Sequence, residues 1–155
     1  MHSFTVCKCD EKVIMEIDLE QFLPYQLNQM ANLISDDFAR VYQQKYNLTI
    51  PQWRVLANLA QYGKSNAKDL CTQANMDKST VSRAIKSLLQ RGYVEAQLNQ
   101  QDKRVTQVML NEPGNAIYKL IARDAQNWEG QLAEKFSKQQ QVQLLNLLKE
   151  LKEAL

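Results

Sequence analysis

The segment from Lys78 to Arg91 carries hydroxyl and basic side chains at spacings that put them on one face of a helix. With about 100° of rotation per residue, positions i, i+3, i+4 and i+7 lie on the same side. These positions are held by Ser79, Ser82, Arg83 and Lys86. Short hydroxyls allow a helix to approach its partner closely, arginine pairs bidentately with guanine, and lysine pairs with phosphate. Lys78 and Thr80 in the first turn complete the predicted contact set.

The opposite side of the same helix is apolar and is made of Val81, Ala84, Ile85 and Leu88. One face is therefore expected in a core and the other in contact with a partner. The whole chain has a net charge of +2, but residues 64–104 hold eight basic and four acidic residues, a local net charge of +4. This imbalance indicates an anionic partner, although a solvated charged surface would give the same count.

Periodicity and capping residues predict four helices in the first part of the chain. The first helix begins at a capping box over Asp18–Gln21 and runs to Tyr46, and the second begins at Pro51 and ends at Gly63. The third runs from Asn66 through Ala74. The fourth is capped by Asp77 and ended by Gly92. These helices must place the basic face described above.

The remaining residues predict a hairpin followed by two helices. Alternating and β-branched residues mark two strands, Tyr93 to Leu98 and Val105 to Leu110. Pro113 opens a long helix to about Phe136, and a capping box over Ser137–Gln140 begins a leucine-rich helix that ends at Leu155.

Two short helices, the second of them basic and joined to the first by a few-residue turn, form a helix-turn-helix. The hairpin behind them is then a wing, with Asp102, Lys103 and Arg104 at its tip. Arg104 suits the electronegative minor groove of DNA, and Asp102 could hold its guanidinium in place. The alternative is a surface ion pair between these two residues that contributes little.

Other classes of protein are not supported by the residues present. The chain has one histidine, His2, and its three cysteines, Cys7, Cys9 and Cys71, lack disulfide-like spacing. A metal set, a nucleophilic constellation and a phosphate-binding loop cannot be recognised. Apolar runs stay below the ~18 residues of a membrane span, and the first residues do not resemble a secretory signal. We therefore expect a cytoplasmic protein that is not an enzyme, has no cofactor and does not enter a membrane.

The chain resembles the MarR family of winged-helix repressors. The resemblance rests on LTIPQWRVL, on AKDLCTQANMDKSTVSRAIKSLLQRGYV, on the DKR wing and on the segment Leu110 to Gly114. It covers Pro24 to Leu155, with one departure at Asn111, where the family often has threonine. It implies a mainly α (α+β) fold, a winged helix-turn-helix with N- and C-terminal dimerisation helices. The expected organisation is an arm at residues 1–17, dimerisation helices at 18–46 and 113–155, and a DNA-binding domain at 47–112.

The resemblance also implies a homodimer that binds a pseudo-palindromic double-stranded DNA operator. The last two helices carry more apolar surface than one small winged domain can cover, which favours an intersubunit role independently. The residues expected at the dimer interface are Leu120, Trp128, Phe136, Leu144, Leu148 and Leu151.

Release from DNA by a small aromatic carboxylate is the mechanism that the resemblance favours. A pocket lined by the first two helices would use Met30, Asn32, Arg40 and Trp53. Trp53 could equally be a core residue and Arg40 a solvated charge. Two alternatives remain open at the level of the sequence: a thiol-based redox repressor that uses Cys7 or Cys9, and a winged helix that binds protein instead of DNA.

Overall fold

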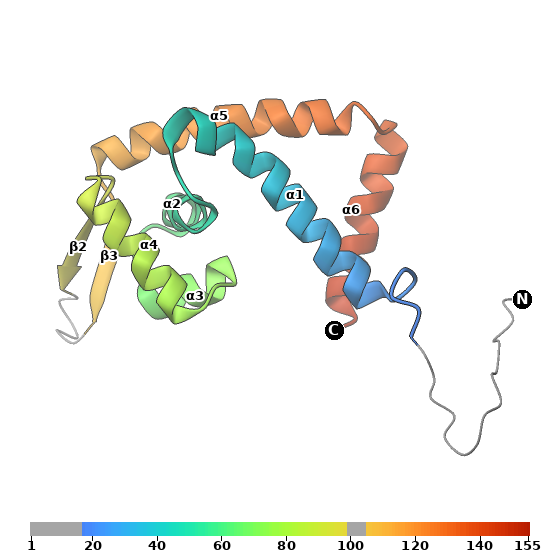
Figure 1. Ribbon diagram of the computed structural model, residues 1–155, viewed down its shortest axis with the longest axis horizontal. Coiled ribbons are helices and arrows are strands. Elements are labelled where there is room, and N and C mark those ends of the chain that lie inside the picture. The colour runs from blue at the N-terminus through green and yellow to red at the C-terminus, as the bar shows by residue number, and fades with distance from the viewer. Residues whose placement is uncertain (1–16, 99–104) are drawn as a thin grey trace, which may run out of the picture. The chain divides into compact units, whose positions relative to one another are not determined.

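The computed structural model describes residues 17–98 and 105–155 (Figure 1). Contacts divide the chain into two compact units, one ending at Ile34 and one running from Ser35 to Leu155. In order, the elements are α1 (Leu23–Tyr46), α2 (Ile50–Tyr62), β1 (Ser65–Asn66), α3 (Ala67–Ala74), α4 (Lys78–Gln90), β2 (Val94–Leu98), β3 (Thr106–Leu110), α5 (Glu112–Ala133) and α6 (Lys138–Glu153). This is the mainly helical winged helix-turn-helix expected from the sequence.

Polar side chains cap most of the helices of the second unit. At the start of α2, Thr49 and Gln52 form a capping box that the sequence did not predict, and the predicted proline lies in the first turn. Ser137 and Gln140 form the predicted capping box at the start of α6. The side chains of Asn66 and Asp77 cap α3 and α4 as predicted. Each of these side chains accepts a hydrogen bond from a backbone N–H group that the helix cannot satisfy internally.

Three predicted helix ends differ from the structure. Asp18–Gln21 does not cap α1: it closes a separate turn in which the Gln21 amide donates to the Asp18 carbonyl at 3.1 Å. α1 begins later, at Leu23. α5 stops at Ala133 and not near Phe136, and α6 stops at Glu153 and not at Leu155. Helix ends fray into turns, which is where sequence patterns are least informative.

The sheet has one strand that the sequence did not predict. β2 and β3 form the expected antiparallel hairpin, in which Ala96 lies opposite Val108. The two-residue strand β1 pairs with the other edge of β3, where Ser65 lies opposite Val108, so the strand order is β1-β3-β2. β1 is too short to show an alternating pattern, and only its pairing partner reveals it.

The core of the second unit lies where α2, α3 and α4 pack against one another and against the sheet (Figure 1). Its fully buried side chains include Leu56 of α2, Leu70 of α3 and Ile121 of α5. The predicted apolar face of α4 is buried there, with Val81 and Leu88 both at 0% exposure. The prediction for that face is confirmed.

A close backbone approach fixes the start of α5 against the residues that follow α4. Asn111 caps α5 by accepting from the Gly114 amide at 2.9 Å, and its own side-chain amide donates to the Gly92 carbonyl at 2.9 Å. A Cβ added to Gly114 would lie 1.8 Å from the Tyr93 carbonyl oxygen. Glycine is therefore required by packing at this position.

We predict that Gly114→Ala lowers the free energy of unfolding by about 1–3 kcal/mol, because α5 must move away from Tyr93 to make room. Gly130, in the same helix, is the matched control, since nothing lies within 4 Å of a Cβ added there. Gly130→Ala should stabilise the protein by about 0.5–1 kcal/mol through helix propensity alone. Urea unfolding of both variants measures this, and equal effects would contradict the close approach.

Candidate nucleic-acid interface

The first turn of α4 is organised around the carboxylate of Asp77. Its Oδ1 accepts from the Thr80 amide at 2.9 Å and from the Ser79 hydroxyl at 2.7 Å, and its Oδ2 accepts from the Thr80 hydroxyl at 2.6 Å. The hydrogen bonds from Thr80, and after them those from Ser79, hold the pKa of the Asp77 carboxyl well below its usual range. Asp77 therefore remains ionised at the start of a basic helix.

The outward side of α4 carries the side chains that the sequence singled out. Lys78, Ser79, Ser82, Arg83 and Lys86 are exposed. Thr80 is half-buried. The Arg83 guanidinium reaches back along the helix, with Nη2 at 3.3 Å from the Ser79 hydroxyl oxygen and 3.5 Å from that of Thr80. The basic and hydroxyl side chains thus share one surface, which we call the outer face of α4.

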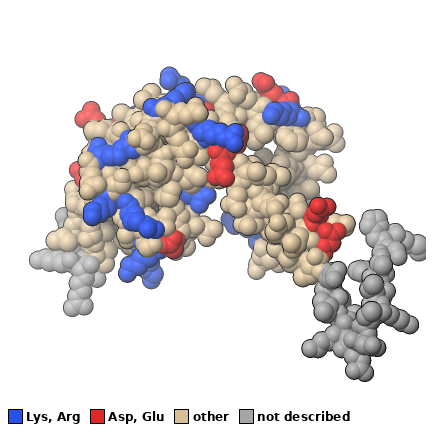
Figure 2. Space-filling view, in the orientation of Figure 1, with Lys and Arg blue, Asp and Glu red and all other residues tan. Residues whose placement is uncertain are grey.

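The basic side chains are concentrated on one part of the molecular surface. Figure 2 shows Lys and Arg side chains gathered over the part that contains α2, α3 and α4. A positive surface attracts a polyanion and raises its rate of association.

Beneath the outer face, α4 is docked onto the start of α2 by a buried polar contact. Gln52 is 8% exposed; its Nε2 donates to the Ser87 hydroxyl at 2.7 Å and its Oε1 accepts from the Thr49 amide at 2.8 Å. A shallow hollow of about 300 Å³ lies beside this contact, bounded by Thr49, Pro51, Gln52, Thr80, Arg83 and Ala84.

The other end of α4 is held by Arg91, whose role the sequence reasoning missed. Its guanidinium donates to the carbonyls of Asn47 at 2.6 Å and Tyr46 at 2.9 Å, which are backbone groups at the end of α1. The guanidinium also lies over the Tyr93 ring, 5.1 Å from the centroid. Asn47 has a φ of 51°, the left-handed conformation that ends many helices. A cation here satisfies carbonyls that α1 cannot satisfy internally.

The same end of α1 is bound to α5 through Asp124. The Tyr46 hydroxyl donates to Oδ2 of Asp124 at 2.8 Å, and Lys45 Nζ lies 3.0 Å from the same oxygen. The hydrogen bond from Lys45, followed by that from Tyr46, lowers the pKa of the Asp124 carboxyl, and the Asp124 carboxylate raises the pKa of Tyr46. We call Tyr46, Asn47, Arg91 and Asp124 the α1–α4–α5 junction.

The residues proposed for an effector pocket are distributed over both units. Met30 and Asn32 belong to the first unit and are exposed there. Trp53 is half-buried in an aromatic cluster of the second unit, stacked on Tyr118 at 6.0 Å and edge-on to Phe38 at 5.6 Å. Arg40 is exposed and pairs with Asp37 at 3.5 Å.

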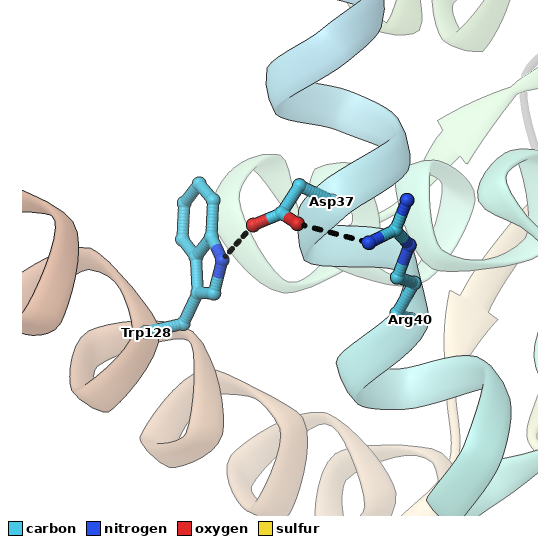
Figure 3. Close-up of polar contacts among 3 residues, drawn as sticks. All are labelled: Asp37, Arg40 and Trp128. Atoms are coloured by element: carbon cyan, nitrogen blue, oxygen red, sulfur yellow. Dashed lines mark hydrogen bonds and ion pairs between the residues drawn. The ribbon is translucent and has the colours of Figure 1, made fainter.

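The residues proposed for the dimer interface are mostly exposed in the single chain. Leu120, Phe136, Leu144 and Leu148 are exposed, and Leu151 is half-buried. Trp128 is also half-buried, and its indole Nε1 donates to Asp37 at 2.9 Å (Figure 3). Its ring packs against Phe38 at 5.2 Å, so in the protomer it joins α5 to α1.

Asp102, Lys103 and Arg104 of the wing tip, and Cys7 and Cys9 of the arm, lie outside the described residues. Within residues 17–98 and 105–155, three or more potential metal ligands do not come together. Over the same part of the chain, no helix is both long and apolar enough to cross a membrane.

Comparison with known proteins places this interface in context. The model of the MarR family matches residues 46–105. The HTH-type transcriptional regulator YwoH of Bacillus subtilis is 31% identical over 103 residues, which cover 66% of this chain and 74% of YwoH. The HTH-type transcriptional repressor IacR of Pseudomonas putida is 30% identical over 99 residues, which cover 64% of this chain and 59% of IacR.

Solved structures agree in fold over most of the chain. A MarR/EmrR family transcriptional regulator from Acinetobacter sp. ADP1 superposes with a TM-score of 0.77 at 28% identity, covering 89% of this chain and 97% of the other. The structure of BpsR of Bordetella bronchiseptica superposes with a TM-score of 0.69 at 21% identity. In that comparison 82% of this chain and 98% of BpsR are covered. The DNA binding of BpsR is regulated by 6-hydroxynicotinic acid.

The junction generates a prediction about stability. Arg91→Ala should lower the free energy of unfolding by about 1.5–3 kcal/mol, because two carbonyls lose a charged donor. Arg40→Ala is the matched control: it removes the same type of side chain from an exposed ion pair and should change stability by less than about 0.5 kcal/mol. Urea unfolding distinguishes them, and two equally stable variants would show that Arg91 does not hold α1 to α4.

Proposed function

Because the chain belongs to the MarR family of winged helix-turn-helix transcriptional regulators, which bind DNA, we propose that it is a repressor that binds a pseudo-palindromic operator as a homodimer and leaves it when a small aromatic carboxylate binds. The observation that carries the DNA-binding part is the orientation of α4. Its apolar face is buried and its outer face presents Arg83 and Lys86 to solvent.

The outer face matches the chemistry of the major groove. Arg83 offers two donors for the N7 and O6 atoms of guanine, whereas Lys78 and Lys86 act as point charges toward phosphates. Ser82 is short and exposed between them. We also propose, from the sequence, that the wing tip contacts the adjacent minor groove through Asp102, Lys103 and Arg104.

A dimer is supported by apolar surface that stays exposed among the residues that the structure describes. α6 has no buried residue, and Leu144, Leu145 and Leu147 are each more than half exposed. Contiguous apolar surface of this kind marks an interface. A twofold-symmetric dimer presents two copies of α4 and so requires two half-sites separated by roughly 34–36 Å.

We predict that Arg83→Ala weakens binding to the preferred DNA sequence by about 1–3 kcal/mol and relaxes base preference. The experiment selects duplexes from a random pool with the wild-type protein and then measures affinities for a panel of variants of the selected site. Arg123→Ala removes an equal charge from an exposed position on α5 and should leave the preference unchanged.

The same panel tests the function itself. Selected sites should contain inverted repeats bound by two protomers, and affinity should fall steeply with salt. An equal loss for every sequence in Arg83→Ala would make Arg83 a phosphate contact. If the wild type enriches no sequence and its binding is insensitive to salt, the DNA-binding proposal fails and a protein-interaction module is favoured.

An aromatic effector is supported by two observations of different kinds. BpsR, which shares the fold, is described as regulated by 6-hydroxynicotinic acid, an aromatic carboxylate. In this chain, the half-buried Trp53 lies in an aromatic cluster at the meeting of α1, α2 and α5, a surface on which a ring could stack. A ligand can weaken DNA binding only by preferring a protein conformation that binds DNA poorly.

We predict that a hydroxybenzoate, hydroxynicotinate or cinnamate quenches Trp53 fluorescence and lowers operator affinity roughly 5- to 150-fold, a coupling of ~1–3 kcal/mol. The titration uses a Trp128→Phe background, after a check that losing the bond to Asp37 leaves the protein folded and able to bind DNA. Peroxide is the competing signal. The effector proposal is wrong if the acids change nothing while peroxide releases DNA from the native protein but not from a Cys7→Ser, Cys9→Ser variant.

A further inference from the structure

The first turn of α4 contains hydroxyl groups whose hydrogen-bonding direction is determined by a neighbour. Ser79 and Thr80 place their hydroxyl oxygens 2.7 and 2.6 Å from different oxygens of the Asp77 carboxylate. An ionised carboxylate has no proton to donate, so it accepts in both contacts. The short distances are those of charge-assisted O–H···O⁻ bonds. The Ser79 and Thr80 protons therefore both point at Asp77.

Each hydroxyl has a single proton, and this geometry leaves only lone pairs for any other partner. Arg83 already uses this property, because its Nη2 lies 3.3 Å from the Ser79 oxygen and 3.5 Å from the Thr80 oxygen, where it can only donate. An aspartate is ionised at neutral pH, and the bonds from Thr80 and Ser79 lower the Asp77 pKa further, so the carboxylate remains the acceptor. The hydroxyl oxygens of Ser79 and Thr80 thus form an acceptor surface, with the donor groups of Lys78 and Arg83 beside it.

An acceptor surface discriminates among the groups of a DNA duplex. Phosphate oxygens, guanine N7 and O6, and thymine O4 are acceptors and cannot pair with it. The amino groups of adenine N6 and cytosine N4 are donors that can. We infer that Asp77 is a specificity-determining positioning residue, which holds the protons of Ser79 and Thr80 so that the start of α4 selects adenine or cytosine amino groups in the major groove.

This inference rests on the proposed entry of α4 into the major groove, and it changes the role expected for the hydroxyls. A serine or threonine that is free to rotate can donate to a phosphate and then carries no sequence information. Here such a contact would require breaking a charge-assisted bond to Asp77. The carboxylate also carries a negative charge toward DNA, which reduces affinity for every sequence equally and is separable from selectivity.

Asp77→Asn tests the inference because it keeps the helix cap while changing the proton pattern. Asparagine is as good a cap as aspartate, and its Oδ1 would still accept from the Thr80 amide. Its Nδ2 then replaces Oδ2 opposite the Thr80 hydroxyl and donates to it, which frees the Thr80 proton. Thr80 becomes a donor in this variant, whereas Ser79 can continue to donate to Oδ1.

The experiment compares base preferences selected from random duplexes by the wild type, Asp77→Asn, Ser79→Ala, Thr80→Val and the double variant Asp77→Asn, Thr80→Val. The wild type should require adenine or cytosine at a half-site position whose preference is lost in Ser79→Ala or Thr80→Val. Asp77→Asn should shift preference toward guanine or thymine by roughly 5-fold or more at the Thr80-dependent position. The shift should disappear in the double variant, because the freed hydroxyl is absent.

A second measurement uses only duplex chemistry and so does not depend on how Asp77→Asn folds. Replacing the selected adenine by purine, or the selected cytosine by 2-pyrimidinone, removes the amino group and should weaken the wild type roughly 5-fold or more while leaving the variant that lacks the contacting hydroxyl unaffected. An unchanged wild-type affinity overturns the inference.

Other outcomes are equally decisive. If Asp77→Asn raises affinity by one factor for all sequences, Asp77 acts through its charge alone and the inference is wrong. A preference shift that persists in the Thr80→Val background also overturns it. Failure of the wild type to enrich any sequence would instead remove the proposed DNA-binding function on which the inference stands.

Discussion

Burial of one side of α4 is the constraint on which the rest of the interface depends. Val81 and Leu88 are completely buried and Ala84 nearly so, and they pack where α2 and α3 meet. Rotating the helix about its axis to show another face would expose these side chains, at a cost of roughly 1.5–3 kcal/mol for each large one. The hydroxyl and basic side chains of α4 are exposed because the apolar side chains of the same helix must occupy the buried side.

Three polar attachments then position the helix that the core has oriented. Gln52 links the start of α2 to Ser87 in the last turn of α4, and Arg91 links the end of α4 to the last carbonyls of α1. Asp124 connects the same end of α1 to α5. Because two of these contacts involve charged groups in partly buried positions, breaking one leaves unsatisfied partners behind. A shift of α1 or α5 must therefore either move α4 or break the junction. In the proposed function, this junction is the physical link through which a ligand near α1, α2 and α5 would act.

Asp77 combines a structural role with a cost to binding. As a cap it satisfies the Thr80 amide, and as an anion it stabilises the positive end of the helix dipole. The same charge disfavours the approach of phosphates. An uncharged serine or threonine cap would avoid that cost but would hold the neighbouring hydroxyls less firmly, because a neutral hydroxyl acceptor forms weaker hydrogen bonds than a carboxylate. The arrangement is consistent with a helix start that contributes selectivity more than affinity.

The local structural features of this protein could be predicted from its sequence. The caps at Asn66, Asp77 and Ser137 and the two faces of α4 depend on groups no more than a few residues apart, so spacing along the chain is enough to predict them. The strand β1, the Arg91 contacts with α1 and the bond from Trp128 to Asp37 could not be predicted, because their partners lie 41 to 91 residues away. The same holds for Gly114, whose need for glycine comes from the Tyr93 carbonyl and not from its own helix. Periodicity identifies which side of a helix is apolar and will be buried. It does not identify the distant residues that pack against that side, because many alternative contacts are equally compatible with the local sequence. Only the complete fold satisfies all of these contacts together.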